Sequence, residues 1–115
     1  MTVYGELLFA ALSGGVAKDR LDDYSRVTDD TPTGWIMRSS ATRHRSWLSN
    51  NERRLQIRER WAEFFADFDA ILLPVHPRPA LHHDHSMPQF ERVVTIDGHD
   101  RPYLDLWTWI APAGL

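Results

Sequence analysis

A short segment rich in histidine carries the residues best suited to metal chemistry. Residues 82–85 read His-His-Asp-His, and imidazole and carboxylate groups are ligands that suit zinc or nickel. On extended backbone, successive side chains point to opposite sides, so His83 and His85 could share one side. A tetrahedral site would need further ligands, such as His76 or His99. We interpret the segment as a polar surface loop; a metal site on His83 and His85, or the rim of a substrate pocket, are the alternatives.

Serine is the second residue type that could do chemistry here, because a serine activated by a neighbouring base can attack a carbonyl carbon. Ser39 and Ser40 are adjacent, but they stand between Arg38 and Ala41 in a stretch that we expect to be helical, with no glycine beside them. Glycine matters because it lets the backbone approach a substrate closely, as an oxyanion site requires. No G-x-S-x-G sequence occurs either. These serines therefore lack the surroundings of a nucleophile.

Another serine and the only lysine lie nearer the amino end. Ser13 precedes Gly14 and Gly15, but this triplet follows a periodic apolar stretch and has the character of a helix terminus. Lys18 comes shortly after it. Serine, histidine and aspartate are all present, so composition alone leaves a Ser-His-Asp triad open. We expect no complete catalytic set within the 115 residues.

Composition and charge narrow the class of protein. The chain has 115 residues, of which 43% are hydrophobic and 25% charged, as in one ordinary globular domain. The net charge of −3 argues against binding nucleic acid, which requires a cationic surface. Cysteine is lacking, which excludes disulfides and thiolate metal sites, and no apolar run approaches the length that a bilayer needs. We expect a cytoplasmic protein with no nucleic-acid and no membrane partner.

The elements that would position these residues are mostly helical. Apolar residues recur at helical spacing in residues 4–12, and residues 26–34 have the composition of an exposed loop. A second helix is predicted from about Gly34 to Leu48. Ser49, followed three residues later by Glu52, fits a capping box and predicts the start of a third helix.

The third helix has the clearest periodicity in the chain. A 100° step gathers its large apolar residues on one face, which we expect to be buried in the core. These residues are Ile57, Trp61, Phe64, Phe65 and Phe68.

A change of pattern follows this helix. Residues 70–75 form a short apolar run that ends near a proline, which predicts one buried strand. Residues 92–104 flank an Asp-Gly pair and predict a β-hairpin. A last short helix is predicted to start at Asp105 and to turn Leu106, Trp107 and Ile110 inward.

The order of these features carries a resemblance. Residues 61–75, which read WAEFFADFDAILLPV, with Pro77 and Pro79 after them, resemble the aromatic helix end, "D-x-L-L-x-P" strand and proline-rich loop of amidase-signature enzymes. Residues 4–15 and 44–47 look like two earlier helices of that family. Further matches downstream are His83, Asp84, His85, the Asp97 and Gly98 turn, Pro102, Tyr103, Leu104 and Trp107.

The resemblance implies an α/β fold in the parent family and a hydrolase of amide C–N bonds that uses a Ser-cisSer-Lys triad and no cofactor. In that family both serines belong to a Gly- and Ser-rich segment that does not occur here. We therefore expect residues 1–115 to be one partial domain, a fragment lacking the catalytic core and the final strand segment, mainly α-helical and inactive alone. The small-molecule amide substrate would bind only to the full-length parent. By family position, Pro74, Val75 and His76 are candidates for lining its pocket.

Two other functions stay open at this stage. One is a non-catalytic binding module derived from an amidase scaffold, which would form a homo-oligomer through an exposed apolar surface. The other is a small metal-binding protein that uses the histidine-rich loop.

Overall fold

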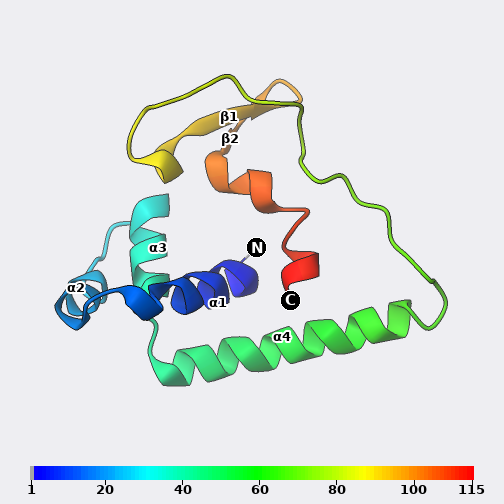
Figure 1. The fold of residues 1–115 in the computed structure, drawn as a ribbon, viewed down its shortest axis with the longest axis horizontal. Helices are drawn as coiled ribbons and strands as arrows, with labels where there is room; N and C mark the ends of the chain where they lie inside the picture. Colours follow the sequence, from blue (N-terminus) through cyan, green and yellow to red (C-terminus); the bar gives the residue numbers. More distant parts are fainter. Residues whose placement is uncertain (1) are drawn as a thin grey trace.

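The chain is mainly helical, as predicted, and carries one antiparallel β-hairpin. A computed structural model describes residues 2–115. The α-helices are α1 (Thr2–Leu12), α2 (Lys18–Tyr24), α3 (Pro32–Ser40) and α4 (His44–Phe64), and the strands are β1 (Val93–Ile96) and β2 (His99–Pro102). Short 3-10 turns are η1 (Ser13–Gly15), η2 (Gln89–Glu91), η3 (Tyr103–Trp107) and η4 (Pro112–Gly114). Figure 1 shows α4 along one side of the molecule and the hairpin on the other, with α1, α3 and η3 between them.

The core is built around the aromatic ring of Phe9 in α1. Its centroid lies 5.8 Å from that of Trp35 in α3, 6.1 Å from that of Phe90 in η2 and 6.1 Å from that of Trp107 in η3. Edge-to-face and offset contacts at these distances are favourable for aromatic pairs. One ring therefore joins four segments that are far apart in the sequence.

Close packing of α1 depends on a glycine. A Cβ on Gly5 would lie 2.3 Å from a ring atom of Trp35, so only a residue without a side chain lets α3 approach this closely. On the other side of α1, buried Asn50 of α4 donates a hydrogen bond to the carboxylate of Glu6. Thus α1 is held between α3 and α4.

The predicted boundaries of the second and third helices are wrong. The helix expected from Gly34 to Leu48 ends at Ser40, and the next begins at His44 rather than at Ser49. Arg43 takes an extended conformation, with φ −73° and ψ 147°, which separates the two helices. Ser49 lies inside α4, because a serine and a glutamate three residues apart are also ordinary helix-interior neighbours. Helix α2 was not predicted from the sequence.

The hairpin forms at the predicted turn. Val93 pairs with Pro102 and Ile96 with His99, so the turn is Asp97 and Gly98. Both have positive φ, 50° and 77°, which is the backbone that Asp-Gly readily supplies. Four residues pair on each strand, a smaller ladder than the predicted range of 92–104.

The buried strand predicted at residues 70–75 is wrong. This segment has no strand pairing and is exposed throughout. A continuous apolar run becomes a buried strand only where neighbouring strands pair with it, and the sheet in the described part of the chain is the two-stranded hairpin. Figure 1 shows the green-to-yellow segment leaving α4 and returning around the outside of the molecule to the hairpin.

The last predicted helix is a 3-10 turn that starts two residues early, at Tyr103. Leu106 is buried, as expected, and Trp107 is half-buried against Phe9. Ile110 remains 39% exposed, which contradicts its predicted inward position, because the chain turns again at residues 108–111 before η4.

Candidate functional site

The adjacent serines of α3 are bonded to the helix that carries them. The Oγ of Ser39 donates to the carbonyl of Trp35 at 2.8 Å, and the Oγ of Ser40 donates to that of Ile36 at 2.9 Å. Serines inside helices commonly bond to the carbonyl four residues earlier. Neither hydroxyl is hydrogen-bonded to a base that could activate it.

A cleft of about 640 Å³ beside α1 and the start of α4 gathers serine, histidine and aspartate. Ser13 and Ser25 donate to the carbonyls of Ala10 and Asp22, each at 2.7 Å, while the ring of His44 stacks on Trp47 with centroids 6.3 Å apart. Within residues 2–115, no hydrogen bond joins a serine hydroxyl to an imidazole. The cleft therefore lacks the contacts that define a catalytic triad.

The only lysine lies away from these groups. Lys18 is exposed at the first turn of α2, and it does not line this cleft. A Ser-cisSer-Lys relay needs the amine within hydrogen-bond reach of a serine. The structure brings no such arrangement together in the part of the chain that it describes.

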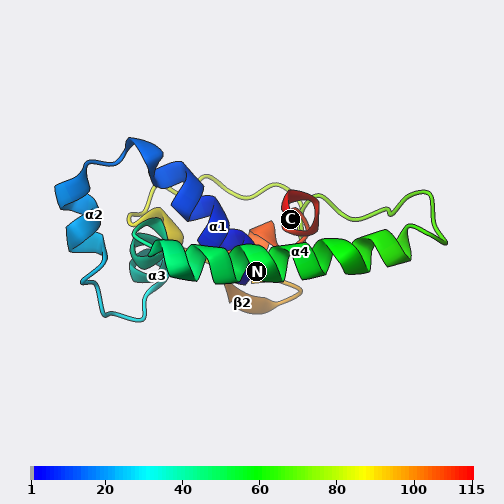
Figure 2. The same ribbon diagram turned by 90° about the horizontal axis from the view of Figure 1, so that it is seen from below.

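The carboxyl-terminal half of α4 displays the aromatic stripe that was predicted to be core. Ile57, Trp61 and Phe64 are half-buried, whereas Phe65 is 44% and Phe68 55% exposed. The prediction of a buried face is therefore wrong for the end of the stripe. Figure 2 shows this end of α4 extending beyond α1 and the carboxyl terminus, so little of the chain covers it.

The apolar surface continues from α4 into the following segment. Leu72 is 96% exposed and Val75 81% exposed, and Ile71 and Leu73 are more than one-third exposed. We call this continuous surface the aromatic face. Its members are Trp61, Phe64, Phe65, Phe68, Ile71, Leu72, Leu73 and Val75. An apolar cleft of about 340 Å³ lies in it, closed on one side by Pro112, Ala113 and Leu115.

The three residues predicted to line a substrate pocket line none of the clefts described in this subsection. Pro74 and Val75 are exposed, and half-buried His76 places its Nδ1 3.1 Å from the carbonyl oxygen of Arg78. None of them lines the apolar cleft, although Ile71 and Leu73 beside them do. Their family role stays a prediction.

The rings of His83 and His85 lie on the same side of the loop, with centroids 6.0 Å apart. A metal site needs more than two protein ligands at coordination distance. In residues 2–115, no group of three or more histidine, cysteine, aspartate or glutamate side chains is placed to hold a metal ion.

The histidine-rich loop instead closes a third cleft against the hairpin. Its volume is about 380 Å³, and its lining includes Arg78, His82, His83, Arg92 and Tyr103. Arg78 and Arg92 were not predicted as site residues, because they are separated by the whole loop and meet only when the hairpin forms. The available signal in the sequence was Arg78, which stands between Pro77 and Pro79 and two residues after His76.

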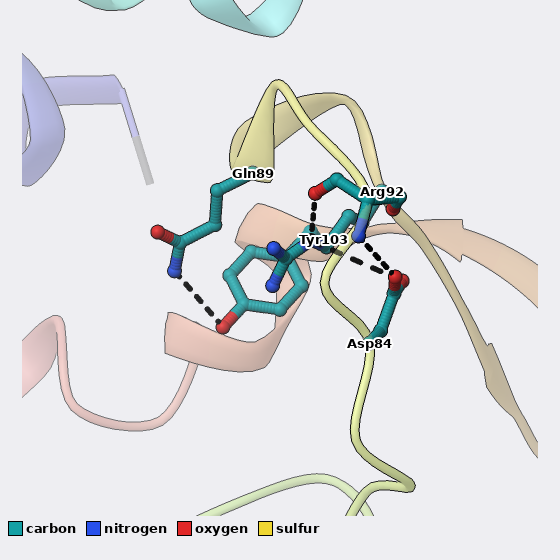
Figure 3. A network of polar contacts seen from close by, with 5 residues as sticks. Asp84, Gln89, Arg92 and Tyr103 are labelled. Carbon is teal, nitrogen blue, oxygen red and sulfur yellow. Dashed lines mark hydrogen bonds and ion pairs between the residues drawn. The ribbon is translucent and has the colours of Figure 1, made fainter.

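Asp84 and Arg92 anchor this loop to the hairpin, as Figure 3 shows. Arg92 donates through Nε to the Ser86 carbonyl at 2.8 Å and lies 3.9 Å from a carboxylate oxygen of Asp84. The guanidinium of Arg92 also covers the ring of Tyr103, whose hydroxyl accepts from Gln89 at 3.4 Å. Hydrogen bonds from Ser86, and secondarily the charge of Arg92, lower the pKa of Asp84.

No protein-family model, curated protein or solved structure matches this chain. Across residues 2–115, each helix is too short or too polar to cross a bilayer. The site must therefore be interpreted from its own geometry and from the motif resemblance.

Proposed function

We propose that this chain is a non-catalytic portion of an amidase-signature hydrolase that acts on amide C–N bonds. The proposed enzyme works in the cytoplasm on a small-molecule amide and needs no cofactor. Its serines would lie in a Gly- and Ser-rich segment, and its lysine elsewhere, all outside residues 1–115. The present chain would supply scaffold that the catalytic segment packs against.

One observation carries this proposal: residues 71–75 are apolar, exposed and unpaired. In residues 2–115, the backbone N–H groups of Ile71, Leu72, Leu73 and Val75 donate to no protein acceptor. An exposed segment of valine and leucine with unpaired backbone groups has the properties of a β-strand whose partner strands are missing. The amidase resemblance assigns a strand to the same residues.

The aromatic face supports the same interpretation. An uncovered stripe of large aromatic side chains at helical spacing is expensive to expose to water and is normally covered by another surface. It continues directly into residues 71–75. A sheet that took up residues 71–75 as a strand would therefore also cover the end of α4.

The proposed parent enzyme would hydrolyse the amide in two steps, and this chain would supply none of the reacting groups. A serine would attack the amide carbonyl, forming an acyl-enzyme and releasing the amine, and water would then release the acid. A lysine would move the proton through the second serine, and backbone N–H groups would hold the oxyanion. Ser39 and Ser40 cannot take these roles while their hydroxyls donate hydrogen bonds to helix carbonyls.

The test joins this chain to the polypeptide encoded upstream. The coding sequence before Met1 should contain, in one frame, a Gly- and Ser-rich segment with a lysine before it. The joined polypeptide should release ammonia from a simple amide such as benzamide, whereas residues 1–115 should not. A Ser39→Ala, Ser40→Ala double variant should keep the joined activity. Hydrolysis by residues 1–115 alone, or the lack of such a segment, would contradict the proposal.

Self-association through the aromatic face is the second candidate, favoured by the charges that flank it. Four arginines and one glutamate lie in residues 53–60, whereas Glu63, Asp67 and Asp69 follow without a basic residue. Two copies of α4 placed antiparallel would bring the basic end of each against the acidic end of the other. This candidate gives a dimer without any additional polypeptide.

Sedimentation of the purified chain tests the second candidate. A dimer that dissociates with added salt and with Phe68→Ser would support it. Arg26→Ser is the matched surface control, because Arg26 is exposed on the distant segment after α2. A chain that stays monomeric at 100 μM would exclude it and leave the hydrolase portion as the proposed function.

A further inference from the structure

The cleft between the histidine-rich loop and the hairpin is lined by two arginines and one carboxylate, that of Asp84. Arg78 lines the cleft from the loop side, and Arg92, the residue before β1, lines it from the hairpin side. Its volume of about 380 Å³ falls in the range of small-molecule pockets. Neither the proposed hydrolase chemistry nor the aromatic face uses these two arginines.

Arg78 has unused hydrogen-bond capacity. One of its terminal nitrogens donates to the carbonyl of Thr95 at 2.8 Å, which fixes the guanidinium against the hairpin. Its Nε is buried and has no acceptor in residues 2–115. A guanidinium has five N–H donors, and leaving them unmet away from water is unfavourable. Because Nε is sealed from the cleft, an oxyanion there would accept from the other terminal nitrogen of Arg78, which has no hydrogen-bond acceptor in residues 2–115.

The charges that line the cleft set the charge of the ligand. Arg92 is 15% exposed and is partly neutralised by Asp84 at 3.9 Å. Two guanidinium groups against one carboxylate leave one positive charge, so the cleft matches a monoanion better than a dianion. Arg78 is the arginine without a carboxylate beside it.

The rest of the wall combines apolar and aromatic side chains with the polar side chains of His82, His83 and Thr95. Leu81 lies on the loop side, Val94 is buried in β1, and Tyr103 closes the cleft beneath the Arg92 guanidinium. A ligand with one charged end and one apolar body would satisfy both parts of this lining.

We infer that this cleft binds a small organic monocarboxylate, with Arg78 as its main anion contact and Leu81 and Val94 against its apolar body. Figure 3 shows Arg92 and Tyr103 on the hairpin side of the site, with Asp84 of the histidine-rich loop beside Arg92. Binding here does not depend on amide hydrolysis. Its test therefore uses affinity alone.

The experiment titrates the purified 115-residue chain with benzoate and follows its amide cross-peaks by NMR. Benzamide has the same ring without the charge, and inorganic phosphate has charge without the apolar body. Benzoate should bind saturably and shift Val94 and Thr95, and each comparison compound should bind at least roughly tenfold more weakly. Equal affinity for benzamide or phosphate would overturn the inference.

Arg78→Gln tests the assigned contact. Glutamine removes the charge and, because it is shorter, also the terminal nitrogen that donates to Thr95, so the hairpin cross-peaks of the free variant are compared with those of the parent chain. Benzoate affinity should fall at least roughly tenfold. Arg101→Gln removes a 59% exposed arginine from β2, outside the cleft, and should change the affinity less than twofold.

Two results would contradict this assignment. One is an Arg78→Gln variant with free-protein hairpin cross-peaks like those of the parent chain and unchanged benzoate affinity. The other is an equal loss of affinity in Arg78→Gln and Arg101→Gln, which would reveal a general charge effect. If Arg78→Gln disturbs the hairpin, Arg78→Lys takes its place and should bind benzoate with intermediate affinity.

Discussion

Phe64 and Phe68 stack on each other, with ring centroids 4.6 Å apart and ring planes at 21°, while Phe68 stays 55% exposed. Stacking hides one face of each ring but leaves an aromatic surface in water. The same rings sit at helical spacing in the sequence, where they predict a core. Within residues 2–115, Phe68 instead stays outside the core around Phe9.

Removing exposed aromatic residues should change the surface without unfolding the protein. Phe65→Ser with Phe68→Ser should alter the free energy of unfolding by less than about 1 kcal/mol, because neither ring is in the core around Phe9. Binding of an apolar fluorescent dye should fall. A loss of several kcal/mol in a denaturant titration would show that the aromatic face is structural within this chain.

The opposite result is expected for Phe9. Phe9→Ala removes a ring that contacts Trp35, Phe90 and Trp107, and it should lower the free energy of unfolding by about 3 to 5 kcal/mol. Phe65→Ala makes the same chemical change at an exposed position and is the matched control. Equal effects of the two substitutions in urea unfolding would contradict the assigned core.

Gly5 tests how closely α1 and α3 approach. Gly5→Ala places a methyl group 2.3 Å from the Trp35 ring and should lower the free energy of unfolding by about 1 to 3 kcal/mol. Gly14→Ala meets no atom within 4 Å and is the control. Thermal unfolding of both variants decides the point, and an unaffected Gly5→Ala midpoint would mean that the helices lie farther apart.

Asp29 should make stability depend on acid. The Thr31 hydroxyl, followed by the Thr31 backbone N–H, donates to Asp29 and lowers its folded-state pKa. The ionised form therefore stabilises the fold at pH values above the unfolded-state pKa of about 3.9, and this contribution disappears as the pH falls through the lower folded-state pKa. The stability difference between wild type and Asp29→Asn should shrink over that interval.

Urea unfolding from pH 5 to pH 2 measures that difference. Asp30→Asn is the control, because Asp30 forms no side-chain hydrogen bond within residues 2–115. A wild-type advantage that grows toward low pH would have the wrong sign and would refute the role of Asp29.

Features that depend on residues adjacent in the sequence were predictable. Asp97 and Gly98 specify the hairpin turn because their own backbone preferences suit it, and Gly14 and Gly15 follow the end of α1 as expected. The break before His44 was not predictable, because nothing in the residues around it excludes a continuing helix.

Features that depend on distant partners were not predictable. Residues 70–75 have the composition of a buried strand, but burial requires a sheet. Similarly, Arg78 and Arg92 face one cleft only because the loop folds back on the hairpin. The helical setting of Ser39 and Ser40 was predictable, because it depends on the residues next to them in the sequence, and both lie in α3.

Hydrogen–deuterium exchange at Ile71, Leu72, Leu73 and Val75 tests the central claim most directly. In the chain alone, these amides should exchange at nearly the rate of an unstructured peptide, because no protein acceptor protects them. In a hydrolytically active polypeptide that also contains the upstream Gly- and Ser-rich segment, they should exchange at least roughly a hundredfold more slowly. Slow exchange in the chain alone, or fast exchange in the active longer polypeptide, would contradict the claim that residues 71–75 pair as a strand only in the longer polypeptide.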